Sequence, residues 1–204
     1  APPAAAGVAH NANAPMMLFC GAGIRTAAET LMDAFQKQHG DKIDVTYGGS
    51  GHLMGQISTF KRGDLFMPGD DWYVEEAIGK GLALKETKRA IACFVPVIIV
   101  PKGNPAGIAT LRDFTRPGVR VGMGDPRACA IGKQSPKVFE KNKIAFDAVK
   151  PQIVYQSGTV EELGVAVGMR SVDGALVWDI TARHFADKVD VIALPADQNI
   201  ISPI

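Results

Sequence analysis

A glycine-rich turn constrains this chain more than any other sequence feature. It is the stretch VTYGGSGHL at residues 45–53, where an alternating strand pattern passes through three glycines and one serine into a helical pattern. Glycine lets the backbone turn tightly, and a helix that begins here directs its positive end and its free N–H groups at one point. Ser50 adds a hydroxyl donor. The stretch predicts an anion-binding loop, although an ordinary strand-to-helix connection explains the same pattern.

The same strand, glycine loop and helix unit recurs through the first half of the chain. The units are residues 16–20 with Gly21-Ala22-Gly23 and a helix to Gly40, residues 42–47 with the opening turn and a helix to Phe60, and a short buried strand within 63–70 with a helix at 72–79. Repeated βα units predict a mainly parallel sheet whose functional edge lies at the carboxyl ends of its strands. Asp70 precedes the third helix and is predicted to cap it.

The second half repeats this pattern after a long apolar strand at 90–102, which is long enough to leave one sheet and enter another. Further strands are predicted at 117–121, 151–155, 172–178 and 189–194, and helices at 131–143, 160–169 and 180–186, with Thr159 as an N-cap. The fold class is therefore α/β, with two Rossmann-like domains joined by two crossover strands around a cleft.

The expected organisation has three parts. Residues 1–15 form a flexible tail, residues 16–92 with 195–204 form the first domain, and residues 93–194 form the second. The last five residues are typical of the beginning of a strand, so we expect the chain to continue beyond Ile204.

Composition excludes several function classes. A net charge of +1 over 204 residues gives no reason to expect nucleic acid or an anionic membrane as a partner. The longest apolar run, broken by Pro96, is too short to span a bilayer. Cys20, Cys93 and Cys129 lack zinc or disulfide spacing, which predicts buried free thiols. No nucleophile elbow or Walker loop is present, so we expect neither an enzyme nor a cofactor.

Five patterns occur in a fixed order along nearly the whole chain from Met16 onward. They are residues 19–23 before a helix, the loop at 48–51, residues 63–66 with Asp70 and Trp72, residues 97–102, and Gly124-Asp125-Pro126 before Gly132. Together they resemble the periplasmic molybdate/tungstate-binding proteins of ABC importers, which have the type II periplasmic-binding, or Venus flytrap, fold. The resemblance implies that a tetrahedral oxyanion is held between two domains and delivered to a membrane permease.

The resemblance also implies which residues contact the ligand. In that family, serine hydroxyls and backbone N–H groups of two first-domain loops hold the oxyanion, together with backbone N–H groups and a tyrosine hydroxyl of the second domain. The serine positions correspond to Gly23 and Ser50, the backbone positions to Ile131 and Val160, and the tyrosine to Trp178. Gly23 has no hydroxyl and Trp178 offers only an indole N–H. The expected ligand-binding residues are Ala22, Gly23, Arg25, Gly49, Ser50, Ile131, Thr159, Val160, Trp178 and Asp179.

Two charged residues near these positions leave alternatives open. Arg25 either supplies a positive charge to the cleft or is a solvated residue of the first helical turn. Asp179 either caps the helix at 180–186 or faces the ligand, where a carboxylate would favour an oxyanion that still carries a proton. His52 and Cys129 could contribute to a metal site, but no third ligand has a recognised spacing, so no metal is expected.

These patterns predict a solute-binding protein in the periplasm or otherwise outside the cytoplasm, with membrane association left open. It would bind molybdate or tungstate as a monomer and pass the ion to the permease of an ABC importer. The sequence also leaves open a binding protein for another anion, whether phosphate-like, sulfate-like or small and organic. A βα enzyme or a ligand-sensing domain on the same fold is the remaining alternative.

Overall fold

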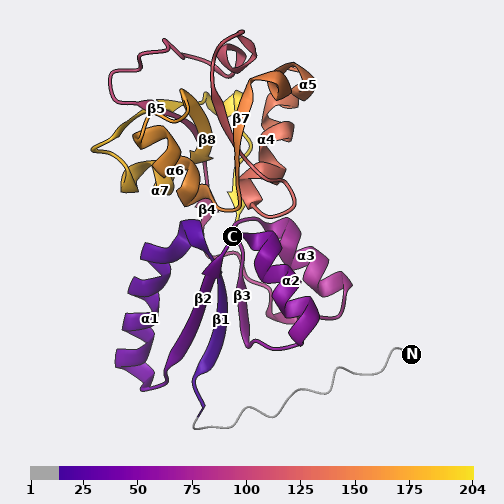
Figure 1. Cartoon of the computed structure of the whole chain (residues 1–204). Coiled ribbons are helices and arrows are strands. Elements are labelled where there is room, and N and C mark those ends of the chain that lie inside the picture. Colours follow the sequence, from indigo (N-terminus) through magenta and orange to yellow (C-terminus); the bar gives the residue numbers. More distant parts are fainter. Residues whose placement is uncertain (1–13) are drawn as a thin grey trace.

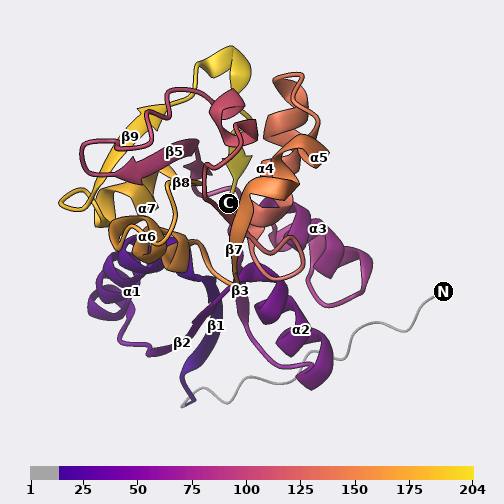
Figure 2. The same cartoon turned by 45° about the horizontal axis from the view of Figure 1, so that its top comes forward.

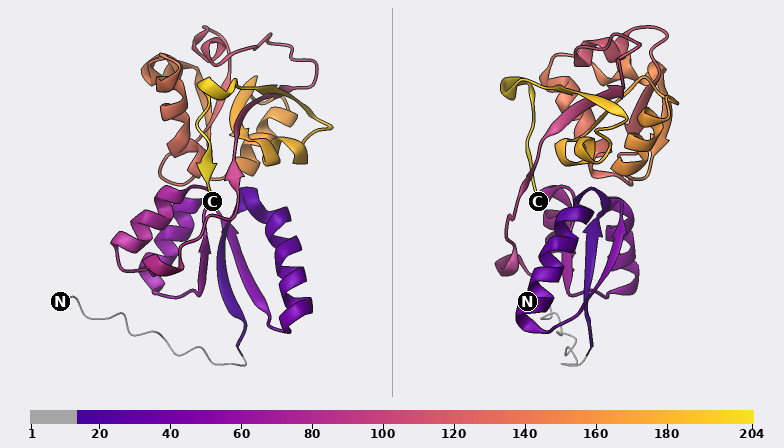
Figure 3. Two further views of the ribbon diagram at one scale, coloured as in Figure 1. Left: turned by 180° about the vertical axis from the view of Figure 1, so that it is seen from behind. Right: turned by 90° about the vertical axis from the view of Figure 1, so that its left-hand side faces the viewer.

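The computed structural model describes residues 14–204, which form two α/β lobes stacked end to end (Figure 1). Most of the predicted tail, residues 1–13, lies outside the described residues. The lobes are connected by two short antiparallel strands, β4 (Cys93–Phe94) and β10 (Ser202–Pro203), which run side by side (Figure 3). The predicted α/β class with two crossovers is confirmed. Within the described residues, no helix is long and apolar enough to cross a membrane.

Lobe 1 is built on a parallel sheet of order β2-β1-β3. Its elements are β1 (Met16–Gly21), α1 (Arg25–His39), β2 (Ile43–Gly48), α2 (Ser50–Phe60), β3 (Leu65–Met67) and α3 (Asp71–Gly79). Gly21 pairs with Gly48 in the sheet register, so the two glycine loops emerge side by side. The third strand was predicted to be buried, but β3 is an edge strand and Leu65 is 46% exposed.

Lobe 2 is built on a mixed sheet of order β7-β6-β8-β5-β9, with β5 antiparallel to both of its neighbours. Its strands are β5 (Pro96–Pro101), β6 (Val121–Gly124), β7 (Ile153–Ser157), β8 (Gly174–Trp178) and β9 (Val189–Ala193). Its α-helices are α4 (Ala130–Lys141), α5 (Phe146–Val149), α6 (Val160–Gly168) and α7 (Asp179–His184). Five short 3-10 helices are distributed along the described part of the chain: η1 (Ala22–Ile24) and η2 (Lys85–Thr87) before β4, and η3 (Leu111–Thr115), η4 (Lys150–Gln152) and η5 (Ala196–Gln198) after it.

Two predicted boundaries in lobe 2 are wrong. The strand at 117–121 is observed at 121–124, because Gly122 and Gly124 serve close packing rather than a turn. A Cβ on Gly124 would lie 2.8 Å from the Gly132 nitrogen, so α4 rests directly on β6. The strand at 90–102 is interrupted at Val95, whose carbonyl accepts a hydrogen bond from the Asp179 N–H at 2.9 Å.

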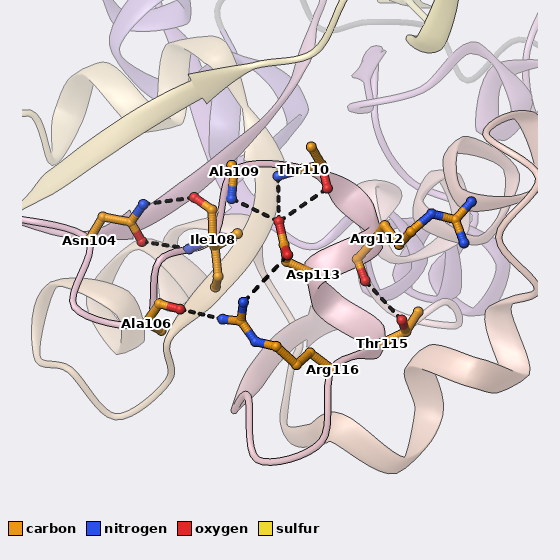
Figure 4. Close-up of polar contacts among 9 residues, drawn as sticks. All are labelled: Asn104, Ala106, Ile108, Ala109, Thr110, Arg112, Asp113, Thr115 and Arg116. Carbon is orange, nitrogen blue, oxygen red and sulfur yellow. Dashed lines mark hydrogen bonds and ion pairs between the residues drawn. The ribbon is translucent and has the colours of Figure 1, made fainter.

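A long connection between β5 and β6 is held together by polar contacts among its own residues (Figure 4). Asp113 accepts hydrogen bonds from the N–H groups of Ala109 and Thr110, at 2.9 and 2.8 Å, and these bonds hold the pKa of its carboxyl below the usual value. Asn104 exchanges two hydrogen bonds with Ile108. The connection therefore forms an ordered surface segment.

The chain returns from lobe 2 along a segment that contacts both lobes. Asn142 and Lys141 of α4 donate hydrogen bonds to the carbonyls of Gln198 and Asn199, at 2.8 and 2.6 Å. Ser202 in β10 then donates to Asp70 of lobe 1 at 2.5 Å. We therefore propose that lobe 1 resumes near β10 rather than at residue 195.

All three cysteines are free, and Cys93 is exposed, contrary to the prediction that they are buried thiols. Cys93 lies in the short connecting strand β4, in which Cys93 is exposed and only Phe94 is buried. Cys20 and Cys129 are buried as predicted, and burial raises the pKa of their thiols to about 12 and about 11. Both therefore stay protonated at neutral pH.

Candidate ligand-binding site

A small cavity of about 20 Å³ lies where the two lobes meet. It is lined by Gly21, Ala22, Gly23, Gly48, Gly49, Ser50, Gly69, Phe94, Cys129, Ala130, Thr159, Val160 and Trp178. Among the residues that the structure describes, no charged side chain belongs to this lining. Seven of the ten sequence-predicted residues are brought together here, and they come from both lobes. Their role as ligand contacts remains a prediction.

Four helical N-termini meet at this cavity, because the lining includes Ala22, Ser50, Ala130 and Val160, the first residues of η1, α2, α4 and α6. Figure 1 shows α1 and α2 rising to the junction between the lobes. The N-cap residues of η1, α2 and α4 make no side-chain capping bond. The first N–H groups of η1 and α2 are thus left without a side-chain acceptor, and the helix dipoles add positive potential. This arrangement suits an anion.

Ser50 is the best-placed hydroxyl of the cavity. It is 2% exposed and opens α2, where its Oγ accepts a hydrogen bond from the Gly69 N–H at 2.9 Å. A hydroxyl that accepts this bond still has its own proton to donate. Gly69 follows the strand β3, so the loop after this third strand also contributes to the cavity.

Three predicted residues are absent from the lining. The Arg25 guanidinium lies over the Tyr47 ring, 4.1 Å from its centroid. Ile131 is fully buried, and the cavity is lined one residue earlier, by Ala130. The backbone N–H of Ile131 bonds to the Cys129 thiol instead, and this bond opposes the rise in the pKa of that thiol. The position of the Arg25 guanidinium depends on its side-chain rotamer, and the residue that α4 presents to the cavity depends on where that helix begins.

Asp179 does not cap the helix that follows it, and its role as a ligand contact stays a prediction. The helix begins at Asp179 itself, with Trp178 as its N-cap, so the predicted cap is wrong. The Val95 N–H donates to the Asp179 carboxylate at 3.4 Å, in addition to the bond between the Asp179 N–H and the Val95 carbonyl. The carboxylate thus fastens α7 to the interrupted crossover strand. Its side chain is not part of the cavity lining.

The other two predicted caps are confirmed. Asp70 accepts a hydrogen bond from the Trp72 N–H at 2.8 Å, and Thr159 accepts one from the Glu162 N–H at 3.4 Å. Phe94, Cys129 and Ala130 were not among the expected site residues. Phe94 in particular had no local signal, since it reaches the cavity only because β4 crosses between the lobes.

The lobes contact each other directly around the cavity. The Gly51 N–H of lobe 1 donates to the Ala128 carbonyl of lobe 2 at 2.9 Å. On one side, the Lys133 ammonium lies 3.3 Å from the centroid of the Trp72 ring, and on another, Thr26 Oγ1 lies 3.1 Å from His184 Nε2. These contacts join different lobes, so the structure is a closed form in which the lobes touch around the cavity.

The contact between Lys133 and Trp72 offers a direct test of closure. Replacing Lys133 by methionine keeps the chain length but removes the charge, so we expect ligand binding to weaken about two- to fivefold, from the loss of roughly 0.5–1 kcal/mol of cation–π energy. Lys137→Met, on an exposed position of the same helix, is the control. Calorimetric titration of both variants with the oxyanions expected from the sequence measures the difference, and equal affinities would mean that this contact does not stabilise the closed form.

Comparison with known proteins agrees with the observed fold. A family model described as bacterial extracellular solute-binding protein matches residues 16–204. The chain belongs to this family. A putative binding protein of Haemophilus influenzae is 30% identical over 187 residues, which cover 89% of this chain and 73% of the relative. The molybdate-binding protein ModA of Mycobacterium tuberculosis is 23% identical over 188 residues, which cover 92% of this chain and 69% of ModA.

Solved structures show the same fold with various ligands. The solute-binding protein resembles the periplasmic molybdate-binding protein of Azotobacter vinelandii, with a TM-score of 0.72, 16% identity, and coverage of 92% and 84%. It also resembles the sulfate-binding protein SubI of Mycobacterium tuberculosis, with a TM-score of 0.74, 18% identity, and coverage of 93% and 73%. A third similar structure is AfuA of Actinobacillus pleuropneumoniae, solved with fructose-6-phosphate. Its TM-score is 0.75 and its sequence identity is 14%, with 93% of this chain and 72% of AfuA covered. The fold therefore leaves the ligand of this solute-binding protein undetermined.

Proposed function

We propose that this chain is an extracytoplasmic binding protein that captures a small, fully ionised tetrahedral oxyanion, molybdate or tungstate in the first place, for the permease of an ABC importer. The observation that supports this proposal is the cavity itself. Four helical N-termini and the Ser50 hydroxyl meet at one point, and the lining has no charged side chain among the described residues. Backbone donors and helix ends are sufficient to hold an oxyanion without a countercharge.

No carboxylate belongs to the cavity lining among the described residues, and this favours a fully ionised anion over a protonated one. Phosphate keeps a proton on one oxygen near neutral pH, and an acceptor-only group is what recognises that proton. Asp179 was the candidate for this role, but its carboxylate is bonded to Val95 instead. Molybdate, tungstate and sulfate carry no proton at neutral pH, so a site composed of donors suits all three.

The size of the cavity favours an inorganic ion over an organic phosphate. Pockets for drug-sized ligands measure roughly 300–1,000 Å³, whereas this cavity of about 20 Å³ is close to the space that one or two water molecules need. A tetrahedral oxyanion fits after a small outward movement of one lobe, while a sugar phosphate requires a much larger opening. Sulfate is the second candidate ligand, because it is also a small tetrahedral oxyanion and the small volume does not exclude it.

Binding follows from closure of the lobes. The two connecting strands β4 and β10 allow lobe movement, and closure removes water from the cavity. The N–H and O–H dipoles then act on the anion in a low dielectric, where a hydrogen bond is stronger than in water. Ser50 lies between glycines without a partner base among the lining residues, so we propose a binding role for it rather than a catalytic one.

Thermal unfolding in the presence of molybdate, tungstate, sulfate, chromate and phosphate tests the function. A ligand that binds only the folded state raises the melting temperature with the logarithm of its concentration over its Kd. We expect increases with molybdate and tungstate that are larger than the increase with phosphate. If none of the five anions raised the melting temperature, the oxyanion proposal would be wrong.

Ser50→Ala tests the site. We expect oxyanion affinity to fall about tenfold, because a charge-assisted hydrogen bond contributes roughly 1.5–3 kcal/mol. The Gly69 N–H also loses its acceptor, so the ligand-free protein should lose about 1 kcal/mol of stability. Ser58→Ala, two turns later in α2 and outside the lining, is the matched control. Unchanged affinity in Ser50→Ala would place the binding site elsewhere.

A further inference from the structure

The loop after β3 lies where the two lobes and their connection meet. Gly69, in this loop, is buried and lines the cavity. A Cβ on Gly69 would lie 3.2 Å from the Ala130 Cβ in lobe 2 and 3.5 Å from Phe94 Cε2 in β4. It would also lie 3.6 Å from Ser50 Oγ in lobe 1. A small shift of this loop therefore changes the cavity and the contacts between the lobes at the same time.

Gly69 restricts the hydroxyl of Ser50. A serine hydroxyl has one proton and two acceptor lone pairs, and it rotates to suit its neighbours. The Gly69 N–H donates to Ser50 Oγ at 2.9 Å and so occupies one of the lone pairs. The hydroxyl proton must then point away from Gly69, which leaves it free to bond to an anion in the cavity. The direction of this donor therefore depends on where the loop after β3 is held.

Asp70, the next residue, attaches this loop to the connection between the lobes. It is 8% exposed, and its carboxylate accepts hydrogen bonds from the Trp72 N–H at 2.8 Å and from Ser202 Oγ at 2.5 Å. Ser202 is 2% exposed and pairs with Phe94 where β10 runs beside β4. Figures 2 and 3 mark this end of the described chain, labelled C, at the junction between the lobes. A buried carboxylate with a donor on each oxygen has little freedom to move.

We propose that Asp70 and Ser202 are a positioning pair for the oxyanion site. Their bond holds the loop after β3 against β10, which places the Gly69 N–H on Ser50 Oγ and directs the Ser50 hydroxyl toward the anion. Neither Asp70 nor Ser202 belongs to the cavity lining, so both act through another residue. This inference rests on the proposed function of the cavity as an oxyanion site. It adds that a donor of lobe 1 is oriented from the connection between the lobes.

Ser202→Ala tests whether the pair acts through Ser50. The substitution removes one buried hydroxyl outside the cavity, and we expect the Kd for molybdate to rise about threefold, because the Ser50 donor is no longer held in one direction. In the Ser50→Ala background there is no hydroxyl to orient, so the same substitution should change the Kd by less than about 1.5-fold. Calorimetry of the four proteins measures both factors. Equal factors in the two backgrounds would overturn the proposal, even if wild-type protein binds oxyanions and the proposed function stands.

Two further variants separate positioning from a general loss of stability. Ser135→Ala is the matched control, because Ser135 is also fully buried and donates to the Ile131 carbonyl at 2.6 Å within α4. It should lower the melting temperature as Ser202→Ala does and leave the Kd unchanged. Asp70→Asn should stay within about twofold of the wild-type Kd, since its carboxamide can accept from Trp72 and donate to Ser202 Oγ, whereas Asp70→Ala should lose at least as much affinity as Ser202→Ala. Equal losses in the two Asp70 variants would overturn the pair.

Amide hydrogen exchange at Gly69 tests the link without any ligand. The Gly69 N–H is bonded to Ser50 Oγ, so Ser50→Ala should speed its exchange about tenfold and Ser202→Ala at least about threefold, while Ser135→Ala should have no effect. If Ser202→Ala left this exchange unchanged, the positioning pair would be wrong. If wild-type protein bound none of the oxyanions but the exchange changed as expected, the proposed function would be wrong and the link from Ser202 to Ser50 would stand.

Discussion

Gly51→Ala is expected to abolish oxyanion binding by holding the lobes apart. A Cβ at position 51 would lie 1.9 Å from the Arg127 carbonyl oxygen, 2.8 Å from the Arg127 carbonyl carbon and 2.9 Å from the Ala128 Cα. These atoms belong to the backbone of the other lobe, so no rotamer change relieves the clash. Opening the lobes does relieve it. We therefore expect the Kd for molybdate to rise at least a hundredfold, which corresponds to about 2.7 kcal/mol.

Gly55→Ala in the same helix is the matched control, because a Cβ there meets nothing within 4 Å. It should leave affinity unchanged and stabilise α2 by roughly 0.5–1 kcal/mol, as alanine does in helix interiors. Calorimetry measures affinity, and small-angle X-ray scattering should show a more extended shape for Gly51→Ala at saturating molybdate. The ligand-free melting temperature of Gly51→Ala should stay near that of wild-type protein. Wild-type affinity in this variant would mean that the closed form described above is not the one that binds.

Gly132→Ala is expected to destabilise lobe 2 itself. A Cβ on Gly132 would lie 2.3 Å from the Gly124 oxygen, 2.5 Å from the Gly124 carbon and 2.7 Å from the Asp125 carbonyl carbon. These atoms belong to β6 and its loop in the same lobe, so lobe opening cannot remove the clash. We expect a loss of about 3 kcal/mol in unfolding free energy, the upper end of the usual cost of overpacking.

Denaturant unfolding measures this loss as a lower midpoint with an unchanged slope. Gly79→Ala is the control, because a Cβ there also meets nothing within 4 Å and the residue ends helix α3. Gly132→Ala should also weaken molybdate binding, since moving α4 away from β6 displaces its N-terminus from the cavity. An unchanged midpoint would show that α4 does not need the close approach between Gly124 and Gly132.

The features that depend on neighbouring residues were predictable from the sequence. The strand, glycine loop and helix pattern predicted lobe 1 and a functional edge where Gly21 and Gly48 lie side by side, as the sheet register has them. Asp70 and Thr159 were recognisable as caps because a cap bonds to an N–H two or three residues away. The glycine turn with Ser50 lines the cavity as expected, because the loop and the helix that follows it are adjacent in the chain.

The features that depend on distant residues were decided by the tertiary structure. Asp179 was expected from its local sequence either to cap a helix or to face the ligand, but its carboxylate accepts a hydrogen bond from Val95, which is 84 positions away. Arg25 lies on Tyr47, and Phe94 enters the cavity through the connecting strand. Local patterns along the chain were therefore enough to predict the βα units, the two-lobe architecture and the glycine loops, because short-range backbone geometry specifies them. Which side chains line the cavity could be read only from the folded molecule, because that depends on how the two lobes meet.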